Sequence, residues 1–141
     1  MAKSDPELDH LAGVPLFAGC TRDELALIRK LMTPQKFRPG AKIVVEDSLG
    51  GRFHLITSGT VAISRRGSYI RDLGPGDYFG EMALLDEGPR TATVTANSEV
   101  HTLGLAPFNF RPLVKNNGRL AYNILVSLSA RLRAVENSVR P

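Results

Sequence analysis

Cysteine and long apolar runs are nearly absent from this 141-residue chain. Its single cysteine, Cys20, excludes an internal disulfide and fits a reducing compartment, so we expect a cytoplasmic protein. The polar opening, residues 1–6, leads into no hydrophobic stretch long enough for a signal peptide or a membrane span. We therefore expect no membrane association.

Histidine is also scarce. His10, His54 and His101 lie far apart and form no His-x-His pair, whereas a metal site needs at least three converging ligands. The sequence therefore predicts no metal site. No cluster of His and Asp could activate water, and Cys20 has no neighbouring histidine to make it a nucleophile. We expect no enzymatic activity.

Acidic residues are rare near the C-terminus. The formal net charge is +4, and from Arg111 onward six Lys or Arg face a single acid, Glu136. A solvated helical face explains this charge better than a nucleic-acid patch, because no recognised DNA-binding motif accompanies it. We expect no direct DNA binding.

The segment 1–34 is predicted to be helical. Ser4-Asp5-Pro6 can start a short helix through Leu8 and Leu11. Thr21 to Glu24 form a capping box for a second helix at 22–32, which Thr33-Pro34 would end. Cys20 precedes that box and is interpreted as a small packing residue.

From 35 to 105 the pattern changes to short β-branched and aromatic runs separated by glycine-rich turns. Such regular short strands predict an antiparallel sandwich or barrel, so the fold is mainly β with flanking helices. A jelly roll of about eight strands would close it. The predicted strands cover 42–46, 52–57, 60–64, 68–73, 91–96 and 99–105.

Residues 106–141 return to helical patterns. A short helix at 107–114 is followed by a break at 116–118 and a long helix from Arg119 to about Ser138. The long helix carries a narrow apolar seam that could pack on the β-roll or pair with a second copy. The seam spans barely more than two heptads, so we expect a monomer, with a weak dimer as the alternative. Its residues are Leu125, Leu128, Leu132, Val135 and Val139.

One stretch, 79–94, interrupts the β region. Gly80 lets a backbone approach a ligand, and residues 81–85 suffice for one helical turn whose free N–H groups attract an anion. Arg90 can bind two phosphate oxygens with its planar fork. The Glu81 carboxylate can accept hydrogen bonds from a sugar hydroxyl. These residue types predict a site for a small sugar phosphate with one negative charge.

The motifs F-G-E-M-A-L-L and P-R-T-A-T-V in this stretch resemble the phosphate-binding cassette of the cyclic nucleotide-binding domain family. The resemblance extends more weakly from about Val14 to the C-terminus. It implies one domain over 1–141 with a β-roll, a cassette at 79–94 and a C-terminal helical lid. The ligand-binding residues that it implies are Phe79, Gly80, Glu81, Met82, Ala83, Leu84, Arg90, Thr91 and Ala92.

In the resembling family, Gly80 and Glu81 would meet the ribose 2′-hydroxyl and Arg90 the cyclic phosphate, helped by backbone N–H groups near Ala83 and Ala92. The ligand would be cyclic AMP or cyclic GMP, with no separate cofactor. Domains that accept cyclic GMP often carry a hydroxyl at the position of Thr91. The same hydroxyl could equally touch phosphate, so we expect both nucleotides to bind.

Register counted from the cassette places Arg131 where some resembling channel domains carry a lid arginine. Its guanidinium plane could stack on a purine, and a plain solvated arginine is the alternative. The resemblance also shows one departure, at Glu46-Asp47, where the family commonly has a glycine between two acids. We expect a changed turn there and no loss of the site.

Together these features predict a ligand-sensing regulatory module that binds a cyclic nucleotide and moves its C-terminal helix. Its effector, an unknown protein or domain, is not indicated by the residues. Two alternatives remain: a β-roll scaffold or interaction domain that has lost nucleotide binding, or the sensor fragment of a larger transcription regulator, channel or enzyme.

Overall fold

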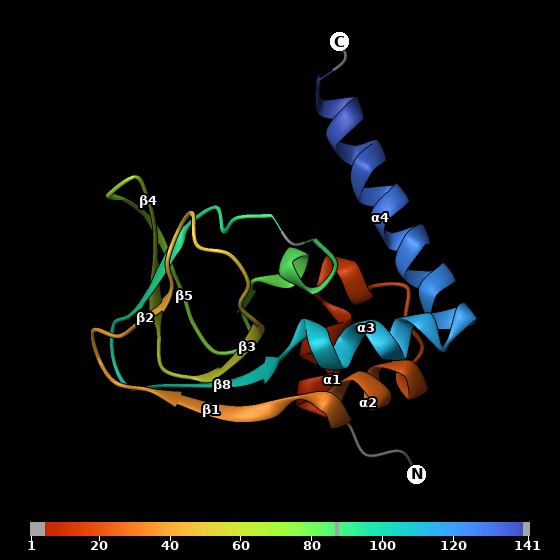
Figure 1. Ribbon diagram of the computed structural model, residues 1–141, viewed down its shortest axis with the longest axis horizontal. Coiled ribbons are helices and arrows are strands. Elements are labelled where there is room, and N and C mark those ends of the chain that lie inside the picture. Colours follow the sequence, from red (N-terminus) through yellow and green to blue (C-terminus); the bar gives the residue numbers. More distant parts are fainter. Residues whose placement is uncertain (1–4, 87, 140–141) are drawn as a thin grey trace. The chain divides into compact units, whose positions relative to one another are not determined.

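The computed structural model describes residues 5–86 and 88–139, which fall into two compact units (Figure 1). One unit draws on Met1–Lys30 and Pro112–Pro141, and the other is Leu31–Arg111. The helical elements are α1 (Pro6–Ala12), η1 (Pro15–Phe17), α2 (Arg22–Leu31), η2 (Glu81–Leu84), α3 (Pro107–Lys115) and α4 (Gly118–Val139). The strands are β1 (Thr33–Phe37), β2 (Lys42–Val44), β3 (Phe53–Ser58), β4 (Val61–Arg65), β5 (Ser68–Leu73), β6 (Tyr78–Phe79), β7 (Thr93–Ala96) and β8 (Val100–Leu105).

The β unit is an antiparallel roll of two four-stranded sheets. Their strand orders are β1-β8-β3-β6 and β2-β7-β4-β5. Apolar side chains from both sheets pack into one core, because alternate residues of each strand point inward. The predicted mainly β fold with flanking helices is confirmed. The buried core residues are Val44, Ile56, Val61, Phe79, Val94, Ala96 and Val100.

Sequence reasoning missed two strands. Thr33-Pro34 were predicted to stop a helix, yet they also begin β1, which pairs with β8 from Thr33↔Gly104 to Phe37↔Val100. Proline is tolerated there because β1 is an edge strand, where a missing N–H costs little. The second missed strand, β6, has only two residues and depends on pairing with β3.

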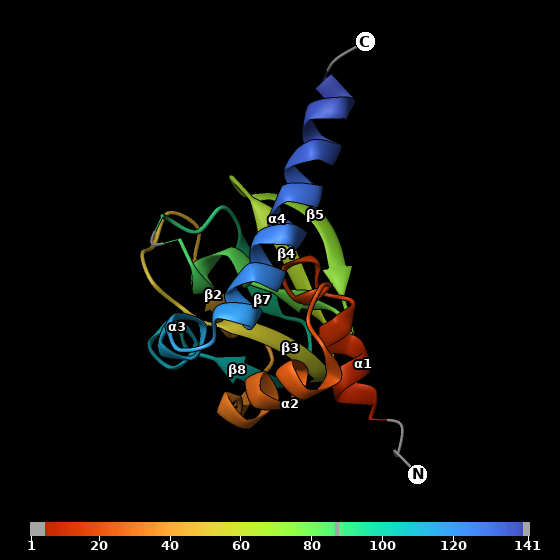
Figure 2. The same ribbon diagram turned by 90° about the vertical axis from the view of Figure 1, so that its right-hand side faces the viewer.

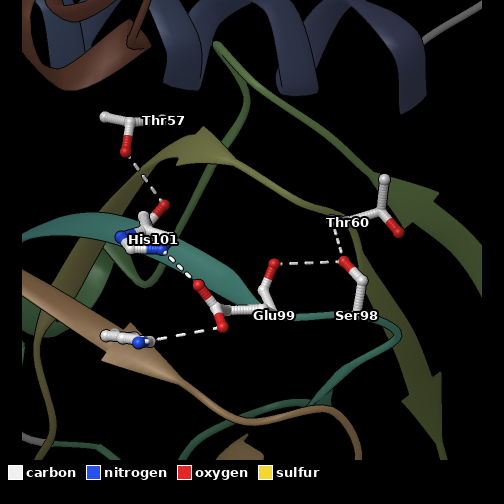
Figure 3. Close-up of polar contacts among 6 residues, drawn as sticks. Thr57, Thr60, Ser98, Glu99 and His101 are labelled. Atoms are coloured by element: carbon white, nitrogen blue, oxygen red, sulfur yellow. Dashed lines mark hydrogen bonds and ion pairs between the residues drawn. The ribbon is translucent and has the colours of Figure 1, made fainter.

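One corner of the roll joins the β3–β4 turn to the start of β8 (Figure 3). The Thr57 hydroxyl donates to the His101 carbonyl oxygen at 3.1 Å, and the Thr60 N–H donates to Ser98 Oγ at 3.3 Å. On the outside of the same corner, Glu99 Oε1 lies 2.9 Å from His101 Nε2. These contacts hold the β3–β4 turn against the start of β8 at this end of the roll.

The helical unit confirms the predicted capping box. The Thr21 N–H donates to Glu24 Oε1 at 2.9 Å, and the Glu24 N–H donates to Thr21 Oγ1 at 3.2 Å. The Glu24 carboxylate also accepts from Asn123 Nδ2 at 2.8 Å. Burial by itself raises the pKa of Glu24, but these hydrogen bonds outweigh it and hold the pKa below its usual value. Cys20 beside the box is half-buried, and this burial raises its pKa to about 11, as expected of a packing residue.

Helix α4 packs only by its N-terminal half within this unit. Leu120 and Ile124 are buried, and Ser127 Oγ accepts a hydrogen bond from the Gly19 N–H at 3.0 Å. Figure 2 shows the later turns of α4 extending away from α1 and α2, and the predicted seam is exposed there at Leu132 and Val135. The side chain of Val139, also assigned to the seam, lies outside the described residues.

A buried histidine packs behind the end of β6. The ring of His54 stacks on Phe79 with centroids 5.0 Å apart, and its Nδ1 lies 2.9 Å from Thr102 Oγ1. Burial lowers the pKa of His54 to about 4, and the nearby charges of Arg90 and Arg52 lower it further. His54 is therefore neutral in the folded protein at neutral pH.

We expect acid to destabilise the fold through His54. Between pH 6.5 and 4 the unfolded imidazole takes up a proton that the folded one does not, so the free energy of unfolding should fall by about 3 kcal/mol over this range. Urea unfolding followed by circular dichroism measures this slope. The double variant His54→Phe/Thr102→Val removes the titrating ring and its hydroxyl partner, and should show a shallower slope. An unchanged slope in the variant would contradict this assignment.

Candidate ligand-binding pocket

A pocket of about 460 Å³ opens in the β unit beside η2. Its walls come from the β2-β7-β4-β5 sheet, from β6 and η2, and from the segment 88–92. The residues that line it are Val44, Ile63, Arg65, Arg71, Leu73, Tyr78, Phe79, Gly80, Glu81, Met82, Ala83, Asp86, Gly88, Pro89, Arg90, Thr91, Ala92 and Val94. Three arginines and two acids therefore face an otherwise mostly apolar cavity.

Arg90 is buried, and its backbone is held by the loop before β3. The Asp47 N–H donates to the Arg90 carbonyl oxygen at 2.8 Å, and the Arg90 N–H donates to the Ser48 carbonyl oxygen at 2.9 Å. The same loop accepts from the side chain: Nη1 donates to the Gly50 carbonyl oxygen at 3.4 Å and Nη2 to that of Arg52 at 3.3 Å. Both ends of Arg90 are thus positioned by 47–52.

These two carbonyls use only part of the guanidinium fork, which leaves N–H donors for a ligand in the pocket. Burial lowers the pKa of Arg90, yet an arginine remains charged at any physiological pH. The pocket therefore holds a fixed, partly desolvated cation. Such a group binds a phosphate through charge-assisted hydrogen bonds.

Two glycines make room for this cation. A Cβ on Gly80 would lie 2.5 Å from Arg90 Nη2 and 2.6 Å from the Arg52 carbonyl oxygen. A Cβ on Gly51 would lie 3.2 Å from Nη1. Both glycines have positive φ, 83° and 105°, which glycine adopts without a steric penalty. The Arg90 guanidinium can therefore occupy this position only because residues 51 and 80 are glycines.

The loop also explains the departure at Glu46-Asp47. Asp47 has φ 67°, a left-handed conformation that a glycine would adopt more easily and that aspartate tolerates. The Glu46 N–H donates to Thr93 Oγ1 at 3.0 Å, so the loop stays fastened to the start of β7. The expected changed turn is therefore a left-handed turn at Asp47, and it still presents Ser48 to Arg90.

The predicted helical turn is a short 3₁₀ helix, η2. Gly80 precedes it in the left-handed conformation, and the Ala83 N–H donates to the Gly80 carbonyl oxygen at 3.2 Å. Glu81 is buried and lines the pocket, whereas Met82 is exposed at its edge.

Eight of the nine ligand-binding residues predicted from the sequence line the pocket together: Phe79, Gly80, Glu81, Met82, Ala83, Arg90, Thr91 and Ala92. Leu84 does not, because its side chain is fully buried beneath η2. Arg131 is exposed on α4, in the other unit, and its lid role stays a prediction.

Sequence reasoning missed two arginines of the pocket, Arg65 at the end of β4 and Arg71 in β5. Arg65 Nε donates to the Thr91 carbonyl oxygen at 2.9 Å and so connects β4 to the segment after Arg90. An arginine in or at the end of a predicted strand was the available signal, but a solvated strand face gives the same pattern.

The described residues include neither a candidate metal site nor a helix that could span a membrane. Over 5–86 and 88–139, no group of three or more His, Cys, Asp or Glu side chains is placed to hold a metal ion. None of the helices in the described part of the chain combines the length and the apolar character needed to cross a membrane.

Comparison with known proteins identifies relatives of this chain. The sequence model of one family, described as "Cyclic nucleotide-binding domain", matches residues 34–117. The chain is 31% identical over 134 residues to a CRP-like cAMP-activated global transcriptional regulator of Mycobacterium tuberculosis, which covers 92% of this chain and 60% of that protein. It is 41% identical over 86 residues to a cGMP-dependent protein kinase of Toxoplasma gondii, which covers 61% of this chain and 9% of the kinase.

The fold has a close structural match as well. The crystal structure of the N-terminal domain of a transcriptional regulator from Streptomyces coelicolor superposes with a TM-score of 0.84 at 31% identity, covering 93% of this chain and 94% of that one. The chain spans about 60% of the length of these curated relatives, the Mycobacterium tuberculosis regulator and a cyclic AMP receptor protein of Thermus thermophilus.

The close contact between Gly80 and the Arg90 guanidinium predicts that alanine substitutions at Gly80 and Gly40 should differ in their cost to stability. Both have nearly the same positive φ, 83° and 85°, but a Cβ on Gly40 meets nothing within 4 Å. Gly40→Ala should therefore cost only the left-handed backbone, about 1–2 kcal/mol. Gly80→Ala should cost about 1–3 kcal/mol more, because it also overpacks Arg90 and the Arg52 carbonyl. Equal losses in urea unfolding would show that the guanidinium moves aside without cost.

Proposed function

Because this chain belongs to the cyclic nucleotide-binding domain family, we propose that it is a regulatory module that binds cyclic AMP or cyclic GMP in this pocket and releases it unchanged. The observation that carries the proposal is Arg90: a buried cation, fixed by 47–52, that faces a cavity beside Gly80 and Glu81. The volume of the pocket, about 460 Å³, lies in the usual range for small-molecule sites.

In the proposed complex Arg90 binds the cyclic phosphate, since a guanidinium fork pairs with two phosphate oxygens. Glu81 accepts hydrogen bonds from the ribose hydroxyl, with Gly80 allowing the sugar to approach the backbone. Phe79, Met82, Ala83, Thr91 and Ala92 form the remaining contacts around the ligand.

A scaffold that has lost nucleotide binding is the main alternative. Burying a guanidinium is costly, and two long hydrogen bonds to carbonyls repay only part of that cost. A fold with no anionic ligand would be stabilised by a neutral side chain at position 90. The retained cation, together with two glycines that make room for it, favours a ligand-binding site.

The wider setting is also part of the proposal. We place the whole of 1–141 in one ligand-binding domain that acts in the cytoplasm on an effector protein or domain. Relatives include transcription regulators and protein kinases, so the effector differs between them. A catalytic role has no support from the pocket, because its charged residues, Arg65, Arg71, Glu81, Asp86 and Arg90, include no histidine or cysteine.

Replacing Arg90 tests ligand binding. Arg90→Ala should weaken binding of cyclic AMP and cyclic GMP by at least about 10- to 150-fold, the equivalent of one lost charge-assisted hydrogen bond. Arg90→Lys keeps the charge but loses the planar fork, so its affinity for both nucleotides should lie between those of the original protein and of Arg90→Ala. Arg38→Ala removes an exposed arginine outside the pocket and should bind as the original protein does. Titration calorimetry on variants that retain the native circular dichroism spectrum measures these affinities; no heat with either nucleotide in a ligand-free original protein would refute the proposal.

Signalling requires an element whose conformational free energy differs with and without ligand. We propose that α4 is this element and that Arg131 stacks on the purine base of the bound nucleotide. Leu120 and Ile124 are buried in the helical unit, so removing all of α4 would uncover that core. A shorter deletion, 129–141, spares both residues and the Ser127 hydrogen bond to Gly19.

We expect the 129–141 deletion to bind cyclic nucleotide more weakly and to release it faster, as judged by stopped-flow displacement. Nucleotide should also slow amide exchange in 119–138 of the intact chain. Arg131→Ala should reproduce part of the loss if its guanidinium stacks on the base, while Arg133→Ala serves as the matched control. Unchanged affinity in the deletion, together with unchanged exchange, would eliminate the lid.

A further inference from the structure

The two residues that follow Arg90 line the pocket without belonging to a strand. The ladder between β4 and β7 ends at the pair Ser64↔Thr93. Residues 91 and 92 precede β7 and lie in no helix or strand, yet both line the cavity. Their backbone is therefore not fixed by ladder pairing, and other contacts must position it.

Arg65 supplies one of these contacts. It is the last residue of β4, one position beyond the end of the ladder. Its Nε donates to the Thr91 carbonyl oxygen at 2.9 Å, so a side chain continues the connection where the ladder stops. Arg65 is exposed, and replacing it leaves the apolar core unchanged. The bond is therefore not a by-product of core packing.

The turn that carries Arg65 is itself held by Glu46. The Glu46 carboxylate accepts a hydrogen bond from the Arg66 N–H at 2.7 Å, and the Glu46 N–H donates to Thr93 Oγ1 at 3.0 Å. The residue after β2, the β4–β5 turn and the start of β7 are thus joined by hydrogen bonds. Arg65 consequently reaches the Thr91 carbonyl from a defined position.

Two carbonyl contacts set the orientation of Thr91. The Arg90 carbonyl oxygen accepts from the Asp47 N–H at 2.8 Å, and the Thr91 carbonyl oxygen accepts from Arg65. Because a trans peptide is planar, its C=O and N–H point in opposite directions. Holding these two carbonyls therefore also fixes the N–H groups of Thr91 and Ala92.

Neither of these N–H groups is used within the described part of the protein. Over 5–86 and 88–139, no carbonyl or side chain accepts a hydrogen bond from the Thr91 N–H or the Ala92 N–H. Successive free N–H groups are donors for an anion. Arg90 can thus bind one oxygen of a phosphate in the cavity while the backbone of 91–92 binds another.

We propose that Arg65 is a positioning residue for the ligand phosphate: by holding the Thr91 carbonyl, it directs the free N–H groups of 91–92 at the phosphate oxygen that Arg90 does not bind. This inference rests on the proposed function, and it requires no contact between Arg65 and the ligand. One exocyclic oxygen of the cyclic phosphate would meet a guanidinium and the other would meet backbone N–H groups. The pocket should therefore distinguish the two oxygens.

The test compares cyclic AMP with its two phosphorothioate diastereomers, in each of which sulfur replaces one exocyclic oxygen. Sulfur accepts hydrogen bonds weakly, so each diastereomer loses contacts at one oxygen only. Titration calorimetry of the full original chain should give unequal affinities for the two. Arg65→Ala should weaken binding of cyclic AMP by about 2- to 10-fold and change the ratio of the two diastereomer affinities by a similar factor. The ratio changes because the diastereomer whose sulfur faces 91–92 then has less left to lose.

Two further variants separate the hydrogen bond from the charge. Arg65→Lys keeps a donor for the Thr91 carbonyl, so its ratio should lie nearer to the original than that of Arg65→Ala. Arg66→Ala removes a neighbouring exposed charge but keeps the N–H that Glu46 binds, and should leave the ratio unchanged. All variants are compared after their circular dichroism spectra match that of the original protein.

A loss by the same factor for all three ligands in Arg65→Ala would show that Arg65 acts through its charge or through stability, and would overturn the inference. No change in Arg65→Ala, equal affinities of the diastereomers in the original protein, or the same change of ratio in Arg66→Ala would overturn it as well. All of these outcomes leave the proposed function standing. If the original protein bound neither cyclic AMP nor cyclic GMP, the proposed function itself would be refuted, and the role of Arg65 with it.

Discussion

The candidate site depends on one constraint, the burial of the Arg90 guanidinium. A charge taken out of water must find hydrogen-bond acceptors, and here the carbonyls of Gly50 and Arg52 supply them. The backbone of Arg90 is held by Asp47 and Ser48, so the loop fixes the residue at both ends. The position of Arg90 therefore depends on this loop.

Neighbouring features follow from the same cation. Gly80 has no side chain because a Cβ would collide with Nη2, and this glycine in turn sets the left-handed entry into η2. His54 stays neutral because burial lowers its pKa and the charge of Arg90 lowers it further, and its ring stacks on Phe79 behind the pocket. The roll provides rigidity around these contacts: two packed sheets hold the cassette in one place while the ligand-facing groups remain in a cavity.

Much of the local structure was predictable because it depends on short-range chemistry. The capping box at Thr21 and Glu24, the helix at 22–31 and the long helix over 118–139 are confirmed with small shifts of their ends. Six of the eight strands follow from β-branched runs between glycines, and eight of the nine predicted ligand residues line one cavity. Strands β1 and β6 were missed because a proline-containing edge strand and a two-residue strand exist only through their partners, β8 and β3.

The amino-acid sequence alone determined the fold class, the family resemblance and the residue types of the cassette, since glycine, acid and arginine at that spacing carry their chemistry with them. Tertiary structure decided three further points. It brought 47–52 against Arg90 across some forty positions of the chain. It buried Leu84 instead of exposing it to the pocket. It also turned Arg71 toward the core side of β5, because the register of the β4–β5 ladder, which its bulge shifts, sets which face each residue occupies, and no local pattern reports that register.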